Sequence, residues 1–100
     1  MKRIEVILSQ AIAVDFEEEY TKICKKEGIK AKFTKVENVV GQGNSNPKLG
    51  DSIWPQLNSV YIIYCEENVS EKIRLALENI NKNYPSEGAA AFSSDAEILV

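Results

Sequence analysis

The stretch best suited to bind a ligand is the segment GQGNSNPKLGDSIWP, residues 41–55 of this 100-residue chain. Gly41-Gln42-Gly43 at its start leaves backbone amides open to close approach by an anion. So long a loop is uncommon inside a small domain and tends to be either functional or disordered. Short glycine motifs are also common, so two interpretations stand: a ligand-binding loop and a plain flexible hairpin.

Trp54 is the only tryptophan, and it lies in the same polar, glycine-rich segment. A large aromatic side chain in such a place either packs under the loop as an anchor or is presented to a partner. The following Pro55 restricts the backbone of Trp54 to an extended conformation. We expect Trp54→Ala to leave the fold intact and to impair loop order or partner binding.

The rest of the chain offers little for catalysis or tight metal binding. It contains no histidine, which excludes Ser-His-Asp and Cys-His catalysis and removes the commonest metal ligand. Glu17, Glu18 and Glu19 are consecutive, so on a helix their side chains point in different directions and cannot converge on one ion. Asp51 has no second group at metal-binding spacing. We therefore expect no enzymatic activity, no catalytic residue and no metal site.

Composition predicts one globular domain, residues 1–100, with a long loop over residues 41–56. Hydrophobic residues make up 44% and charged residues 27% of the chain, which are values of a folded domain. The net charge is −3. Proteins that bind nucleic acids or anionic membranes usually carry a basic surface, which this acidic composition does not predict. For Cys24 and Cys65, which have no local partner spacing, we expect reduced core thiols, with a disulfide as the alternative.

The N-terminal segment MKRIEVILSQ starts basic and then turns apolar. Glu5 interrupts the apolar run, however, and no small-residue cleavage site follows, so we expect a strand rather than a signal peptide. Nothing in the chain approaches the ~20 apolar residues that a membrane span requires. The expected location is therefore cytoplasmic, without membrane insertion.

The first half of the chain predicts two strands and one helix. Alternating apolar residues indicate a strand over residues 3–9. Asp15 has the position of a helix N-cap, with a glutamate three residues later as its capping-box partner, and Gly28 is placed to end this helix. A second strand is predicted over residues 29–40, with a bulge near Thr34 where the apolar phase slips.

The second half repeats this pattern. A strand predicted over residues 57–65 is apolar on both faces, which indicates a central strand covered on both sides. Asn68 is the predicted N-cap of the second helix, which Pro85 ends. Short strands are predicted over residues 88–92 and 96–100.

The resulting order is strand, helix, strand, strand, helix, strand. This is the split pattern of α+β, ferredoxin-like βαββαβ domains, in which an antiparallel sheet carries two helices on one face. Two helices cannot cover both faces of a four-stranded sheet, so the apolar second face needs another cover. A copy of the same chain is the simplest one, which predicts a homo-oligomer.

Three segments, MKRIEVIL, TKVENVVGQG and NVSEKIRLALENI, resemble PII-type signalling proteins over nearly the whole chain. A finer pattern is similar to a short PII-like subgroup associated with heavy-metal efflux pumps. It reads Gly41-x-Gly43, Pro47-x-Leu49-Gly50 and Trp54-Pro55-x-x-Asn58. Because it extends from the first glycine to the asparagine, it is much more specific than the glycines alone.

The resemblance implies a homotrimer of ferredoxin-like subunits, with a small effector such as an adenine nucleotide bound between subunits. The ligand-binding residues that it implies are Gly41, Gln42, Gly43, Glu87 and Gly88. The loop would contact a target protein, for instance a membrane transporter, through Asn44, Lys48, Asp51 and Trp54.

One departure from PII proteins concerns the phosphate groups of the effector. PII proteins carry a lysine in a second glycine-rich loop and arginines near the C-terminus. The corresponding stretch here reads PSEGAAAF, and no Lys or Arg follows Lys82. A triphosphate would lose charge-assisted hydrogen bonds without those cations, so we do not expect ATP to bind in the manner of PII proteins.

The function that we predict is a non-enzymatic PII-like regulator, with a small effector and a partner-binding loop. The alternative is an accessory protein of a heavy-metal efflux system that binds a metal ion or the pump, although the low histidine and cysteine content argues against tight binding of soft metals. An acylphosphatase-like enzyme would need a basic residue in the loop after the first strand. Residues 9–13, SQAIA, contain none.

Overall fold

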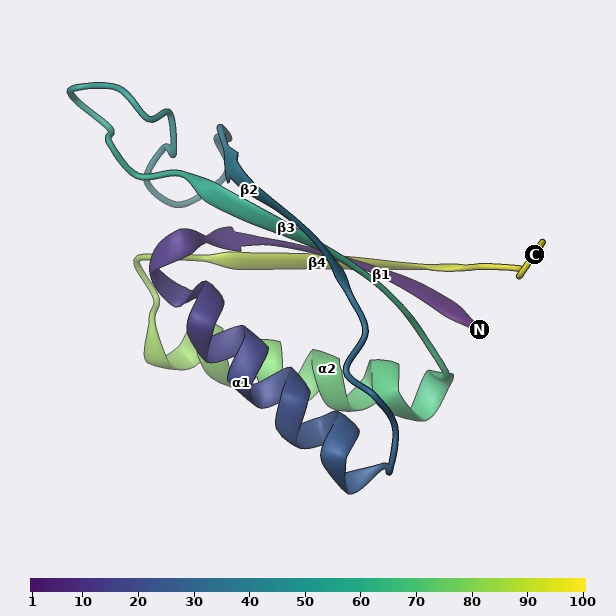
Figure 1. Cartoon of the computed structure of the whole chain (residues 1–100). Coiled ribbons are helices and arrows are strands. Elements are labelled where there is room, and N and C mark those ends of the chain that lie inside the picture. Colours follow the sequence, from purple (N-terminus) through teal and green to yellow (C-terminus); the bar gives the residue numbers. More distant parts are fainter.

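The computed structural model describes all 100 residues and forms one antiparallel sheet with two helices on one face (Figure 1). In chain order the elements are β1 (Lys2–Ser9), α1 (Gln10–Lys26), β2 (Thr34–Val39), β3 (Asn58–Cys65), α2 (Glu67–Asn83) and β4 (Ala89–Asp95). The strand order in the sheet is β2-β3-β1-β4. This is the ferredoxin-like βαββαβ arrangement, so the predicted fold class is confirmed.

The core lies between the helices and the face of the sheet that they cover. Alternation places Ile4, Val6 and Leu8 of β1 on this face, and the register pairs Val6 with Tyr61 of β3. The buried members are Ile4, Val6, Leu8, Ile12, Ala13, Phe16, Tyr20, Cys24, Tyr61, Ile63, Cys65, Val69, Ile73, Leu77 and Ile80. The two central strands and one stripe of each helix therefore supply the core, as their apolar periodicities predict.

The helix starts predicted from capping residues are wrong. α1 begins directly after β1, and its N-cap is Ser9, whose Oγ accepts a hydrogen bond from Ala11 N (3.2 Å). Asp15 therefore lies inside the helix. Asn68 likewise lies inside α2, after the N-cap Glu66, and its Nδ2 donates to Glu27 Oε2 (3.3 Å). In both cases a residue type that is typical of N-caps lies inside the helix, and it indicated the helix start more strongly than the residue that caps the helix.

The predicted ends of the outer strands also need correction. β2 begins at Thr34, so residues 29–33 are not part of a strand. Its irregular pairing with β3 lies between Val36 and Val39, not at Thr34, and Asn38 has a φ of 60° there. β4 runs from Ala89 to Asp95, and residues 96–100 form no strand.

Glu17 belongs to a polar contact between α1 and the sheet rather than to the first turn of the helix. Lys35 Nζ lies 2.9 Å from Glu17 Oε1, and the Tyr61 hydroxyl donates to the same carboxylate. These hydrogen bonds, first that of Tyr61 and then that of Lys35, lower the pKa of Glu17. Burial, and then the bond to Glu17, raise the pKa of Tyr61 to about 12. This carboxylate therefore links α1 to β2 and β3.

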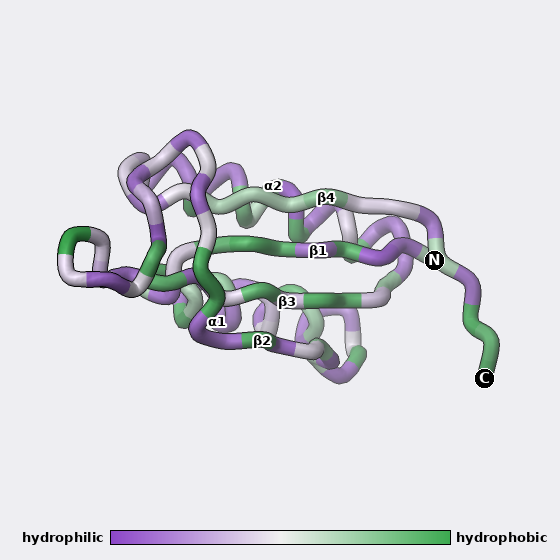
Figure 2. Tube along the Cα trace, turned by 90° about the horizontal axis from the view of Figure 1, so that it is seen from above, coloured by the Kyte–Doolittle hydropathy of each residue, from purple (hydrophilic) through white to green (hydrophobic).

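The face of the sheet opposite the helices, called the open face below, is not covered by any other element of the chain (Figure 2). Cross-strand pairing places Val36, Tyr64 and Phe92 on it, and these side chains are 49%, 54% and 63% exposed. Half-buried Ile7 and Ile62 lie between them on the central strands. Neither helix of the chain has the length and apolar character that crossing a membrane requires.

Candidate functional site

The long connection between β2 and β3 projects beyond the sheet at the end opposite the two termini (Figure 1). Its first half is closed by paired backbone hydrogen bonds, because Gly41 N donates to Lys48 O (2.7 Å) and Lys48 N donates to Gly41 O (2.8 Å). Residues 42–47 thus form a small closed loop. A Cβ atom at Gly41 would lie 2.7 Å from Asn58 Nδ2, so any other residue there would displace that amide.

The second half of the connection is a separate turn held by Asp51. Its Oδ1 accepts hydrogen bonds from Ile53 N (3.0 Å) and Trp54 N (2.6 Å), the pattern of an Asx turn. Gly50 precedes it with a φ of 67°, and a Cβ atom there would lie 2.8 Å from Leu57 Cδ2. The turn leaves Ile53 76% and Trp54 37% exposed. Asp51 therefore shapes the surface that Ile53 and Trp54 present.

A cavity of about 730 Å³ lies between the closed loop and the turn that leads from α2 into β4. We call it the loop–turn cavity. All five predicted ligand-binding residues line it, namely Gly41, Gln42, Gly43, Glu87 and Gly88. Of the predicted partner-binding residues, Asn44 and Lys48 line it as well, whereas Asp51 and Trp54 lie outside it. Open-face residues Ile7, Val60 and Phe92 form another part of the lining.

The turn before β4 is fixed by a residue that sequence reasoning missed. The Asn81 side chain accepts a hydrogen bond from Ala89 N (2.8 Å) and donates to Ala89 O (2.9 Å). Gly88 has a φ of 70°, and a Cβ atom there would lie 2.8 Å from Ser45 Oγ. Only glycine therefore lets the closed loop approach this turn so closely. Neither Asn81 nor Ser45 belongs to a motif whose spacing would have indicated these contacts.

Lys48 and Glu87 are the two ionisable side chains that line the cavity. Lys48 is only 3% exposed, and its Nζ donates to Asn46 O (2.9 Å). Glu87 Oε2 is shielded from solvent, and no donor of the chain lies within hydrogen-bonding distance of it. The remaining polar lining consists of amides and a hydroxyl, from Gln42, Asn44, Ser45, Asn46, Asn58 and Asn81. These groups suit the binding of a polar small molecule.

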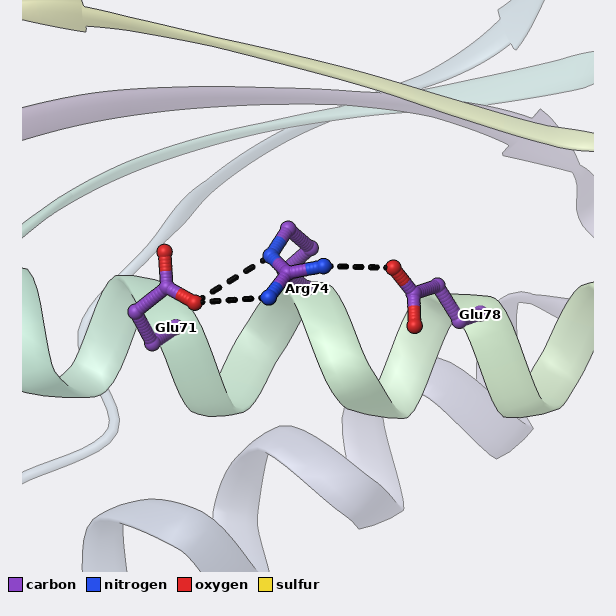
Figure 3. Close-up of polar contacts among 3 residues, drawn as sticks. All are labelled: Glu71, Arg74 and Glu78. Carbon is purple, nitrogen blue, oxygen red and sulfur yellow. Dashed lines mark hydrogen bonds and ion pairs between the residues drawn. The ribbon is translucent and has the colours of Figure 1, made fainter.

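A second charged cluster lies on the exposed side of α2 (Figure 3). Arg74 Nη2 lies 2.8 Å from Glu71 Oε2, and Arg74 Nη1 lies 2.6 Å from Glu78 Oε1. All three side chains are more than half exposed, so these contacts contribute little to stability. They engage both ends of the guanidinium group. The structure also contains no group of three or more His, Cys, Asp or Glu side chains that could hold a metal ion.

No protein-family model matches the chain, and comparison with curated proteins gives no match. Solved structures do resemble it. CPII from Thiomonas intermedia K12 bound to ADP and bicarbonate has a TM-score of 0.69 at 20% identity, over 97% of this chain and 86% of that chain. The same protein bound to ADP, AMP and bicarbonate has a TM-score of 0.66 at 21% identity, with the same coverage.

A PII-like signalling protein from Thermus thermophilus has a TM-score of 0.60 at 17% identity, over 93% of this chain and 83% of that chain. These likenesses extend over nearly the whole chain at low sequence identity. They establish that the chain has the fold of PII-like proteins, as the sequence resemblance implied.

Proposed function

We propose that this chain is a non-enzymatic PII-like regulatory protein. It binds a small effector in the loop–turn cavity and contacts a partner protein through residues 41–56. The observation that carries this proposal is the cavity itself, which gathers Gly41–Gly43 and Glu87–Gly88 from segments far apart in the sequence. The solved structures of the same fold that were determined with ADP, AMP and bicarbonate support a small polar effector.

The proposed assembly is a homotrimer whose subunits cover one another's open faces. Burial of Val36, Tyr64 and Phe92 would remove apolar surface from water, which favours association. Ile7, Val60 and Phe92 belong both to this face and to the cavity lining. A neighbouring subunit would therefore lie beside the effector. Association of the subunits would then affect the affinity for the effector.

The proposed partner surface is the Asx turn beyond the cavity. It presents Ile53 and Trp54 as exposed apolar side chains at the far end of the molecule. The closed loop that precedes this turn also lines the cavity. An effector that contacts the closed loop could thus change the position of the turn, and with it partner binding.

Calorimetric titration of the full chain with AMP, ADP, ATP and cyclic AMP tests effector binding directly. We expect saturable binding of at least one of them with one site per chain. Lys48→Met removes the buried cation at nearly constant shape and should weaken binding about 10-fold or more, because hydrogen bonds to charged groups contribute roughly 1.5–3 kcal/mol.

Lys82→Met is the matched control, because Lys82 is exposed on α2 and lies outside the cavity lining. It should bind as the wild type does. Equal losses in both variants would place the ligand elsewhere, and no saturable binding of any of the four nucleotides would contradict a nucleotide effector.

A further inference from the structure

The charges that line the loop–turn cavity cancel one another. Lys48 contributes one positive charge and Glu87 one negative charge, and no other lining residue is ionisable. Residues 83–100 contain no Lys or Arg, so the turn, β4 and the C-terminal segment bring no further cation. Each phosphate group added to a ligand therefore brings negative charge that the lining residues of the same chain cannot neutralise.

Lys48 has the capacity to hold one anionic group. An ammonium group has three donors, and the hydrogen bond to Asn46 O uses one of them. Lys48 is almost fully buried, so its attraction for an anion is screened less than that of a surface lysine. The cavity can therefore accommodate a single phosphate group at this position.

Glu87 has the opposite requirement. An ionised carboxylate only accepts hydrogen bonds, and its Oε2 atom is shielded from solvent without a donor from the chain. A buried acceptor in this state is unfavourable until a donor is supplied. Glu87 is among the residues that line the cavity, so a ligand bound there lies beside this carboxylate. A hydroxyl or amino group would satisfy it, whereas a phosphate group would be repelled.

From these charges we infer that the cavity is selective for a nucleoside carrying a single phosphate group and discriminates against diphosphates and triphosphates. This inference rests on the proposed effector-binding function. Lys48 binds the phosphate group. Glu87 accepts a hydrogen bond from a sugar hydroxyl or base amino group and sets the selectivity by repelling further phosphates. The amides of Gln42, Asn44 and Asn58 complement the neutral polar edges of such a ligand.

The experiment is calorimetric titration of the full chain with AMP, ADP and ATP, each in the wild type and in Glu87→Gln. We expect the wild type to bind AMP more tightly than ADP, and ADP more tightly than ATP. Glu87→Gln keeps the shape of the side chain and removes its charge, so the ratio of AMP to ATP affinity should fall about 10-fold or more. Glu97→Gln is the matched control, because it changes the net charge equally in the exposed C-terminal segment.

The outcomes separate this inference from the proposed function. Wild-type binding of ATP as tight as that of AMP would overturn the selectivity and leave the effector function standing. An affinity ratio that is unchanged in Glu87→Gln, or equally changed in Glu97→Gln, would overturn the role of Glu87. Failure of all three nucleotides to bind the wild type would contradict the nucleotide effector and this inference together.

Discussion

Gly88 and Gly28 have nearly the same backbone conformation but different surroundings, with φ angles of 70° and 69°. A Cβ atom at Gly88 would lie 2.8 Å from Ser45 Oγ, whereas a Cβ atom at Gly28 would have no neighbour within 4 Å. Alanine at either position should lower the free energy of unfolding by about 1 kcal/mol, because L-residues are strained at positive φ. We expect Gly88→Ala alone to weaken effector binding, since it also pushes the closed loop away from the turn.

Urea denaturation and AMP titration of both alanine variants test this difference. Gly28→Ala controls for the backbone strain without the collision. Wild-type affinity in Gly88→Ala would mean that the contact between Ser45 and Gly88 does not shape the binding site.

Trp54 is partly exposed on the Asx turn and is not a member of the buried core. The hydrogen bonds that Asp51 accepts from Ile53 N and Trp54 N involve the backbone, so they survive removal of the indole. Trp54→Ala should therefore change the melting temperature by only a few degrees. Limited proteolysis should cut the 50–56 segment faster in Trp54→Ala, and Trp54→Phe should restore the wild-type rate. Global unfolding of Trp54→Ala would instead place this side chain among the residues that hold the fold.

At the scale of the elements, the polar contact of Glu17 joins α1 to both β2 and β3. The pKa of the Glu17 carboxyl group is lower in the folded protein than in the unfolded chain. The stability that this carboxylate contributes is therefore fully present above its unfolded-state pKa and is lost as pH falls through its folded-state pKa. Glu17→Gln should lower the free energy of unfolding by about 1 kcal/mol at neutral pH. This value is at the low end for a charged hydrogen bond because the carboxylate is partly exposed to solvent. The same variant should be less sensitive than the wild type to pH below about 4.5.

Glu18→Gln is the control for this measurement, because Glu18 is exposed and makes no ion pair within the chain. Denaturant unfolding between pH 3 and pH 7 compares the three proteins. Parallel pH profiles of Glu17→Gln and the wild type would show that the carboxylate does not support α1 through its charge.

The order and type of the elements could be predicted because the core depends on simple periodicity. Residues two apart on β1 and β3, and three or four apart on the helices, share the buried face. Helix starts were less predictable, because a serine at the end of a strand caps α1 while Asp15, a better N-cap by type, lies inside the helix. Residue preference alone does not decide between two such positions when the strand leads directly into the helix.

The candidate site was predictable in part, and mainly through resemblance. The glycines of the closed loop are visible in the sequence, but nothing in their spacing brings them to Glu87 and Gly88 across the sheet. The role of Asn81 depends on its distance from Ala89 in space, and the closure at Gly88 depends on Ser45. Such contacts arise from the packing of α2 and β4 against the loop, which local patterns do not encode.

At the scale of the whole molecule, the open face is the surface through which the proposed trimer would assemble. Ile62 lies on this face in the central strand β3, directly opposite Glu5 of β1. A lysine at position 62 would face the carboxylate of Glu5 on the neighbouring strand. Such an opposite-charge pair favours retention of the fold. It would also place an ammonium group where a neighbouring subunit should pack, and removing such a charge from water at an apolar interface is unfavourable even beside a carboxylate. We therefore expect Ile62→Lys to be folded but monomeric.

Sedimentation velocity should give the wild type a mass of about three chains of 11.2 kDa and Ile62→Lys the mass of one. Leu75→Lys is the control, because Leu75 is 57% exposed on α2 and lies on the helical side of the molecule. It should remain trimeric. Because Ile7, Val60 and Phe92 connect the open face to the cavity, the monomer should also bind AMP more weakly than Leu75→Lys does. A monomeric wild type, or a trimer that tolerates Ile62→Lys, would exclude assembly through this face.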